Sequence, residues 1–381
     1  MNPSQIKNIT RTKTRSKGVA LITVLLVVAL VSILAMQMTT RLQLQIQRST
    51  NASFNQQAYW LAMGAESFAK RVLIAAFQDE KSYTHLGQAW NAGATTYPVE
   101  YGEISGEISD AQACLNLNAL SHTKLPGNNN SNATPNNPNP SNPANSPNNA
   151  QSPNNQNKSG NKNSGQNQSG SNKPILQLAL VNLITSLELD YISQFEAENM
   201  VDALIDWLDS DSSISSAGGA EDNDYSAKEF PYLAANNNIA SVNELRVIEH
   251  FTPQVINALK PYVCVIPDND IAQININTLS EDKPLLLAAI LDISESEASR
   301  VLSEREEKGY ENINDFYSSE ALSGINLNDE HKKLFVVDSE YFTLKTTTRF
   351  NNSYFSMSSL LRVEENQEIS VIARTVGRFY E

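Results

Sequence analysis

The sequence has few of the residues that build thiolate metal sites, disulfide-rich folds or histidine-based catalytic centres. It contains two cysteines and four histidines among 381 residues, too few thiols for a four-cysteine zinc site. The histidines are scattered, and no glycine-rich phosphate loop, G-x-S-x-G or H-E-x-x-H pattern occurs. Basic residues are also scarce, and a net charge of -14 disfavours contact with phosphate backbones. We therefore expect neither an enzyme nor a nucleic-acid-binding protein.

An uncharged apolar run at residues 19–36 follows a basic N-terminal segment. Residues 1–18 carry five Lys and Arg side chains and no acid. About 20 apolar residues in a helix span a bilayer core of about 30 Å, and the basic flank predicts a cytoplasmic N-terminus. A cleaved secretory signal is the alternative, although its apolar region is usually about 7–15 residues long. We predict one retained span at residues 19–40 and export of the rest of the chain.

The segment Arg15-Ser16-Lys17-Gly18, directly before the apolar run, resembles the leader of type IV prepilins. In that family a prepilin peptidase cleaves after the glycine and methylates the new N-terminus, which implies processing between Gly18 and Val19. Most members have glutamate at the fifth mature position, which is Thr23 here. In this departure the sequence resembles the minor pseudopilin K family of type II secretion systems, which characteristically lacks that glutamate.

The missing carboxylate at Thr23 has a physical meaning. In filaments of the related proteins, the glutamate is thought to pair with the terminal amine of the subunit ahead. A buried carboxylate without a partner is costly, so a subunit with no neighbour ahead of it is expected to lack the charge. Thr23 therefore fits a position at the filament tip.

The sequence after the span predicts an α+β pseudopilin fold with a large helical insertion. Residues 41–76 contain no proline, and segments within 97–120 and 335–381 alternate as strands do. We predict one antiparallel sheet, built from residues 41–125 and 335–381, packed on the long helix. The apolar stripe expected on this helix comprises Leu42, Ile46, Ala58, Leu61, Ala65, Phe68 and Val72. Residues 126–173 are rich in Asn, Ser and Pro and are predicted to be a disordered insertion.

Residues 174–267 and 268–334 contain a weak internal repeat. Segments 241–245 and 312–316 are related by one offset, which also pairs Val263 with Leu334 and Val265 with Val336. Each segment begins with a capping residue followed three positions later by an acid, as helix starts do. We predict two small helical units of SAM-like or helix-hairpin-helix-like type. Asn-rich strands at 115–118 and 274–278 frame the first unit and resemble segments of the pseudopilin K family.

A helix-hairpin-helix unit at 274–316 would also suit DNA binding. In the DNA-binding motif, glycines in the hairpin bring backbone amides against phosphate. Here the hairpin at 291–297 has no glycine and three acids, which oppose phosphate binding. We expect the fold to be kept without nucleic-acid binding.

Six acids without a base among them surround a loop at 212–220 that contains Gly218 and Gly219. They are Asp206, Asp209, Asp211, Glu221, Asp222 and Asp224. Calcium takes six to eight oxygen ligands, which a flexible acidic loop can supply, but the spacing is not that of an EF-hand. The residues alone leave a cation site and a solvated acidic loop as alternatives. The stretch resembles the calcium-binding stretch of pseudopilin K, which implies a structural calcium ion here.

Export changes the expectation for the two cysteines. In an oxidising compartment Cys114 and Cys264 are expected to form a disulfide, with two buried thiols as the alternative.

The resemblance covers residues 15–381 apart from the low-complexity insertion. It implies a minor pseudopilin at the tip of the secretion pseudopilus, which nucleates assembly and caps the filament during protein export across the outer membrane. It also implies minor pseudopilins I and J as partners, a prepilin peptidase for processing, contacts with secreted proteins, and a single inner-membrane span with a periplasmic C-terminal domain. The alternatives are a minor pilin of a type IV pilus or competence filament, and a membrane-anchored periplasmic helix-hairpin-helix binding protein.

Overall fold

The computed structural model describes residues 17–80, 82–120, 173–267, 269–364, 366 and 368–377. The predicted leader up to residue 16 and the predicted disordered insertion at 126–172 lie outside the described residues. The predicted cleavage point falls within the described backbone, at the start of the first helix.

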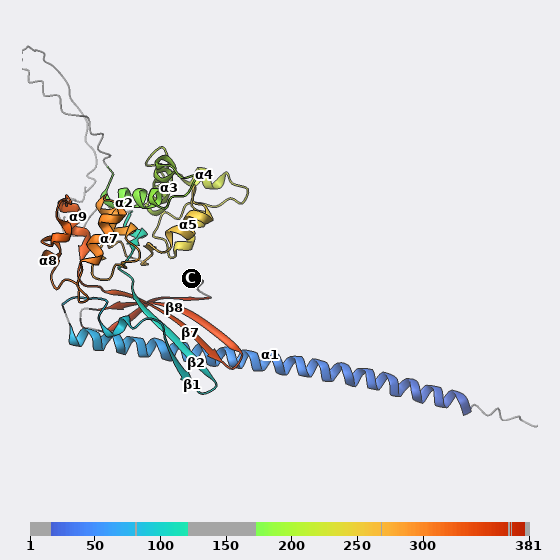
Figure 1. Ribbon diagram of the computed structural model, residues 1–381. Helices are drawn as coiled ribbons and strands as arrows, with labels where there is room; N and C mark the ends of the chain where they lie inside the picture. The colour runs from blue at the N-terminus through green and yellow to red at the C-terminus, as the bar shows by residue number, and fades with distance from the viewer. Residues whose placement is uncertain are drawn as a thin grey trace, which may run out of the picture.

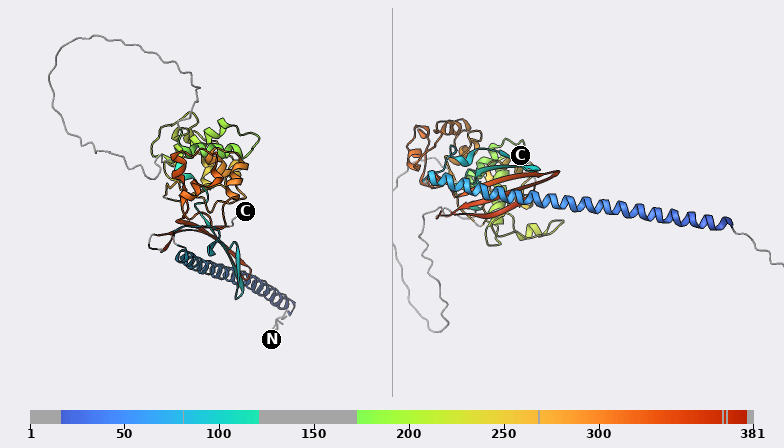
Figure 2. Two further views of the ribbon diagram at one scale, coloured as in Figure 1. Left: turned by 60° about the vertical axis from the view of Figure 1, so that its left-hand side comes forward. Right: turned by 90° about the horizontal axis from the view of Figure 1, so that it is seen from below.

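The first helix, α1 (Lys17–Asp79), runs without a break from the apolar N-terminal segment into the folded domain (Figure 1). Among the residues that the structure describes, one helix is long and apolar enough to cross a membrane, and this is α1. Its N-terminal half projects away from the domain with its apolar side chains exposed (Figure 2). The single helix therefore includes both the predicted span and the predicted pseudopilin helix.

A five-stranded antiparallel sheet packs across the C-terminal part of α1, and its strand order is β1-β2-β7-β8-β9. The strands are β1 (Thr95–Val99), β2 (Gly102–Asp110), β7 (Tyr341–Phe350), β8 (Ser353–Val363) and β9 (Ile369–Val376). Thus β2 pairs with β7 although they are more than 200 residues apart in sequence, and the helical insertion lies between them. The prediction of an α+β fold, with one antiparallel sheet on the long helix, is confirmed.

The face of α1 that contacts the sheet carries mainly small side chains. Ala58, Ala62, Ala69 and Leu73 are buried, in line with Glu66. Alanines allow close approach of helix and sheet, and larger side chains flank them. The predicted stripe was therefore rotated by about one residue. Of its members only Ala58 is fully buried, whereas Leu42, Ile46 and Phe68 are exposed.

The helical head lies on the other side of the sheet from α1 (Figure 1). Its helices are α2 (Ile175–Ser186), α3 (Gln194–Leu208), α4 (Asp222–Ser226), α5 (Pro253–Leu259), α6 (Leu285–Leu291), α7 (Glu295–Ser303), α8 (Ile313–Tyr317) and α9 (Asp329–Leu334). The apolar helix α2 packs on both α3 and α6, so the buried side chains of the two predicted units form one continuous core. At the predicted hairpin, Asp292 ends α6 in the left-handed region, with φ 52°.

Two short parallel strand pairs join the head to the segments that enter and leave it. They are β3 (Leu115–Asn116) with β4 (Val263–Cys264), and β5 (Ile274–Asn275) with β6 (Phe335–Val336). The prediction that residues 335–381 complete the main sheet was wrong for β6, which pairs within the head, whereas β3 lies in the Asn-rich segment expected to frame the first unit. The repeat offset makes Val263 equivalent to Leu334. In the strand pairs Val263 lies opposite Leu115, and the residue opposite Ile274 is Phe335, one position after Leu334.

Buried asparagines after β3 and β5 organise the two units in the same way. The Asn118 side chain donates to the carbonyls of Ile239 and Ile266, both at 3.0 Å, and accepts from the Ile239 amide at 2.9 Å. The second unit repeats this arrangement with Asn277, Tyr310 and Val337. Their partners obey the offset of the predicted repeat, so the Asn-rich segments act as loop anchors as well as short strands.

Candidate metal centre and assembly surface

The acidic cluster forms where α3 ends and its following loop folds back. Asp206, in the last turn of α3, is buried, and its Oδ1 accepts the Ser215 amide at 3.0 Å. Gly219 approaches the other oxygen so closely that an added Cβ would lie 1.9 Å from it. A side chain at residue 219 would therefore collide with the carboxylate, which explains the glycine at this position.

Three of the six predicted ligands converge. Oxygens of Asp209, Asp211 and Glu221 lie within 4.8 Å of one another. Glu221 is only 2% exposed, and both of its carboxylate oxygens lack a hydrogen-bond partner among the described residues, as does Oδ2 of Asp206. Buried polar atoms are nearly always partnered in folded proteins, so these oxygens mark a place where a positive group would fit.

Asp222 and Asp224 have a different position at the start of α4. Oδ1 of Asp222 accepts the Ala234 amide at 3.0 Å, and Oδ2 of Asp224 accepts the Glu221 amide at 3.0 Å. These two acids tie the loops together, whereas Asp206 lies beside the converging three. The sequence grouped all six acids by their proximity along the chain, but it could not indicate which of them converge.

The carboxylates of the acidic cluster repel one another. Burial, followed by repulsion from Asp206 and Asp209, raises the pKa of Glu221 to about 7. Burial also raises the pKa of Asp206 and of Asp209. No Lys or Arg in the described part of the chain forms an ion pair with these acids. A bound cation would lower these pKa values and stabilise the ionised carboxylates, so the donor set fits a hard divalent ion.

Cys114 and Cys264 form a disulfide, with their Cα atoms 5.8 Å apart. The bond lies next to the β3–β4 pair and joins the chain entering the head to the end of the first unit. It closes a loop with a sequence separation of 150 residues.

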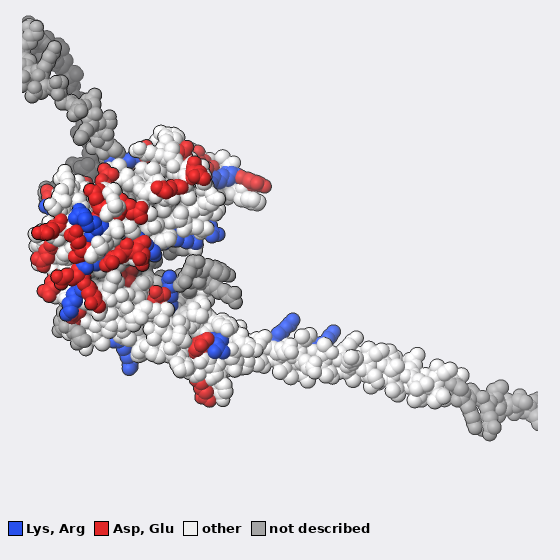
Figure 3. All heavy atoms as spheres, in the orientation of Figure 1, with Lys and Arg blue, Asp and Glu red and all other residues white. Residues whose placement is uncertain are grey.

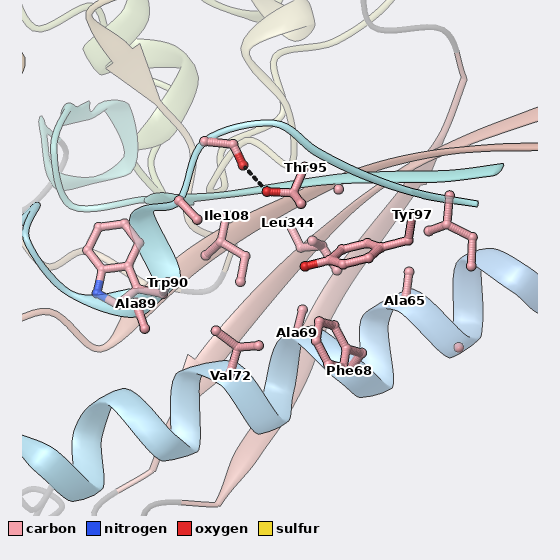
Figure 4. A pocket seen from close by; sticks show the side chains of 15 residues that line it. Ala65, Phe68, Ala69, Val72, Ala89, Trp90, Thr95, Tyr97, Ile108 and Leu344 are labelled. Carbon is pink, nitrogen blue, oxygen red and sulfur yellow. Dashed lines mark hydrogen bonds between the residues drawn. The ribbon is translucent and has the colours of Figure 1, made fainter. Parts of the chain in front are cut away.

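One feature that the sequence did not indicate is an apolar cavity of about 400 Å³ between α1 and the β1–β2 hairpin (Figure 4). Phe68 and Tyr97 form its open edge, with ring centroids 5.9 Å apart, and Val72, Trp90 and Ile108 line its interior. Phe68 is 55% exposed and Tyr97 is 49% exposed. Exposed aromatic side chains next to an apolar cavity indicate a surface suited to another protein.

Glu66 is also a residue that sequence reasoning missed. Its carboxylate is 3% exposed within the helix–sheet contact. One signal could have indicated it, because Glu66 is the only acidic residue between positions 19 and 78. If such an acid is buried, it requires a partner in the fold.

Comparisons with known proteins assign the family. Residues 113–268 and 274–338 match two family models, both described as type II secretion system (T2SS), protein K. The chain is 35% identical over 367 residues to type II secretion system protein K of Dickeya chrysanthemi, covering 96% of this chain and 98% of that protein. It is 32% identical to the Aeromonas hydrophila protein of the same name, covering 78% of each chain.

A solved structure shares the architecture. The chain is similar to a chain of the GspK-GspI-GspJ complex from the type 2 secretion system of enterotoxigenic Escherichia coli, with a TM-score of 0.68 and 28% identity. The similarity covers 87% of this chain and 100% of that one. Identity, coverage and fold agree, and the chain therefore belongs to the type II secretion system protein K family.

Proposed function

We propose that this protein is a minor pseudopilin at the tip of the type II secretion pseudopilus, where it nucleates assembly and caps the filament. The observation that carries the proposal is its similarity to the K chain of a solved GspK-GspI-GspJ complex. By this analogy its partners are pseudopilins I and J of its own secretion system. The N-terminal half of α1 would lie in the inner membrane and the head in the periplasm.

The surface of α1 supports lateral packing with partner helices. Its N-terminal half exposes an apolar surface. A second apolar surface, the cavity edged by Phe68 and Tyr97, lies further along the same helix in the folded domain. A helix of a neighbouring subunit could place an apolar side chain against these rings, as helices do in ridge-and-groove packing. Thr23 supports a tip position, because its hydroxyl donates to the Ala20 carbonyl at 2.9 Å and adds no charge.

A calcium ion fits this proposal as a structural component of the head. Asp209, Asp211 and Glu221 would hold it, with Asp206 beside them. The ion would offset the repulsion among these carboxylates and keep the loop folded against the end of α3. The buried, unpartnered oxygens of Glu221 and Asp206 support this assignment.

Co-purification tests the assembly proposal. The full chain in detergent should retain pseudopilins I and J, and Phe68→Asp should reduce their recovery by about tenfold or more, since it places a charge in an apolar contact. Phe230→Asp is the matched control, because Phe230 is 79% exposed on the head, far from the α1 surface in sequence and fold. No complex with the wild-type chain would overturn the function, and equal loss with both variants would overturn the assigned surface.

Intact mass of the membrane-extracted protein tests its processing. Cleavage after Gly18 and methylation should give a chain that begins at N-methylated Val19. A chain that keeps Met1, or begins beyond Met36, would contradict the prepilin-type pathway and favour an anchored or secreted binding protein.

A further inference from the structure

A second cleft, of about 480 Å³, lies between the head and the sheet. On the sheet side it is lined by Ser109, Thr343 and Leu360, which alternate with the residues that face α1. On the head side it is lined by Tyr262 and Thr278. Its volume falls within the range of about 300–1,000 Å³ typical of ligand sites, and it is separate from both the acidic cluster and the cavity of Figure 4.

Three lysines from three separate segments of the chain line this cleft, which we call the lysine cleft. Lys260 follows α5, Lys283 precedes α6, and Lys345 lies on β7. All three are exposed, and none has an ion-pair partner within the described part of the chain. By contrast, Arg349 and Arg374, elsewhere on the sheet, each pair with a glutamate.

The charge of the lysine cleft contrasts with the rest of the head. The protein has a net charge of -14. Acidic side chains gather over the visible outer face of the head with some basic ones among them, and further basic side chains lie along its edge toward the sheet (Figure 3). Glu107, opposite Lys345 on the neighbouring strand, is one of two acids in the cleft lining. The other, Asp110, has its oxygens occupied by hydrogen bonds from within the wall.

Two connections hold the walls of the cleft in place. Asp110, at the end of β2, accepts hydrogen bonds from Thr278 at 2.6 Å, from Ser339 at 2.5 Å and from the Gln112 amide at 2.7 Å. It therefore links the sheet to the second helical unit. The disulfide of Cys114 and Cys264 borders the same cleft and fixes the first unit. A cleft that is already formed loses little conformational entropy when a ligand enters.

We propose that the lysine cleft binds an acidic, extended segment of a partner polypeptide. Carboxylates of such a segment would meet the three unpaired ammonium groups, and its backbone would lie along hydroxyl-bearing walls. A nucleic acid fits less well, because its dense phosphate charge would also meet the acidic outer face of the head. The proposal does not depend on where the protein sits in a filament.

Fluorescence anisotropy with a labelled hexaglutamate peptide and the full chain in detergent tests the proposal. The variant Lys283→Glu/Lys345→Glu changes one lysine on each wall and should weaken binding by about tenfold or more. Lys332→Glu/Lys333→Glu is the matched control: it makes the same change in net charge at exposed lysines outside the cleft, and should weaken binding by less than about threefold. The neutral variant Lys283→Gln/Lys345→Gln should give an intermediate loss.

Three results would overturn the proposal. They are no peptide binding by the wild-type chain, equal weakening by the cleft and control variants, and tighter binding of a hexathymidine oligonucleotide than of the peptide. Thermal unfolding of each variant shows whether it is folded, and all four substituted lysines are exposed. Recovery of pseudopilins I and J should stay unchanged in the cleft variant, which separates this test from that of the filament role.

Discussion

Glu66 on α1 and Arg374 on β9 form a two-point ion pair across the helix–sheet contact, with Nε–Oε2 at 2.7 Å and Nη2–Oε1 at 2.9 Å. Ser359 on β8 donates a third hydrogen bond to the same carboxylate at 2.8 Å. The hydrogen bond from Arg374 lowers the pKa of Glu66, against burial, which raises it. The ion pair thereby fixes α1 to an edge strand of the sheet, in addition to the apolar contacts between helix and sheet.

Replacing Arg374 by Met should destabilise the folded domain by about 1–3 kcal/mol. A fully buried carboxylate that loses its partner costs about 3–5 kcal/mol, and the smaller figure applies because the Arg374 side chain is 42% exposed and water can reach the site. Thermal and urea unfolding of the detergent-solubilised chain measure the change. Arg349→Met is the control. Arg349 pairs with the exposed Glu103, so losing this pair should destabilise the domain less than Arg374→Met does.

The dependence of folding stability on pH also tests the ion pair between Glu66 and Arg374. The lowered pKa of Glu66 means that its stabilisation is present above the ordinary value near 4.5 and is lost as the pH falls through the folded pKa. The wild-type chain should therefore lose more stability than Arg374→Met between pH 5 and pH 3. Equal acid sensitivity of the two chains would contradict a stabilising pair.

In the absence of calcium, Glu221 should make the folded chain less stable as the pH rises, the opposite of the effect of Glu66. Its pKa is raised to about 7, so the folded chain holds a proton that the unfolded chain releases, and stability falls as the pH rises from about 4.5 to about 7. The loss should reach up to about 3 kcal/mol. Glu221→Gln should remove this fall, which thermal unfolding in a chelating buffer at several pH values would measure.

In the wild-type chain, calcium should reverse this fall in stability at higher pH. At a concentration of about 100 times its Kd, a bound ion adds about 2.7 kcal/mol to the free energy of unfolding. At pH 8, above its pKa of about 7, Glu221 is mostly ionised and can bind the ion. Calcium should stabilise the Glu221→Gln variant less than the wild-type chain. If millimolar calcium leaves the melting temperature of the wild-type chain unchanged, the metal assignment is wrong.

The disulfide should be a large part of the stability of the head. For a loop with a separation of 150 residues, the chain-entropy account gives about 5 kcal/mol, and native disulfides in secreted domains are worth about 2–5 kcal/mol. Reduction should therefore lower the melting temperature clearly. A Cys114→Ser/Cys264→Ser variant should start at the lower value and be insensitive to reductant; sensitivity in that variant would show that the reductant acts elsewhere.

The fold could be predicted from the sequence where periodicity or composition gives a local signal. The apolar run, the alternating strands near both ends of the chain and the two capping segments of the head all lie in continuous stretches. The predictions that failed concern contacts between residues that are far apart in the sequence. Which side of α1 meets the sheet is determined by the fit of alanines and by Arg374, some 300 residues later. The lysine cleft likewise joins residues from β7 and both units of the head.

At the candidate metal site, too, the sequence indicated the local feature but not the contacts made in the folded chain. Six acids close together in sequence were enough to indicate the loop. Three of the carboxylates converge, Asp206 lies beside them, and Asp222 and Asp224 lie apart at the start of α4. This arrangement depends on how the loop folds back over α3, with Gly219 against Asp206. No pattern of residue types along the chain contains that close approach.

Placing a glutamate at position 23 tests the tip position directly. Thr23 is exposed on α1, and its hydroxyl already bonds to the helix backbone. Thr23→Glu adds a carboxylate that, at a filament tip, would have no terminal amine ahead of it. An unpaired acid in a membrane helix costs on the order of 3 kcal/mol, so recovery of assembled tip complexes and secretion should fall by about tenfold or more. Thr23→Ser keeps the hydroxyl and should behave as wild type. Full secretion by the Thr23→Glu chain, with normal levels of the protein in the membrane, would mean that this position meets an amine and that the subunit lies within the filament instead of at its end.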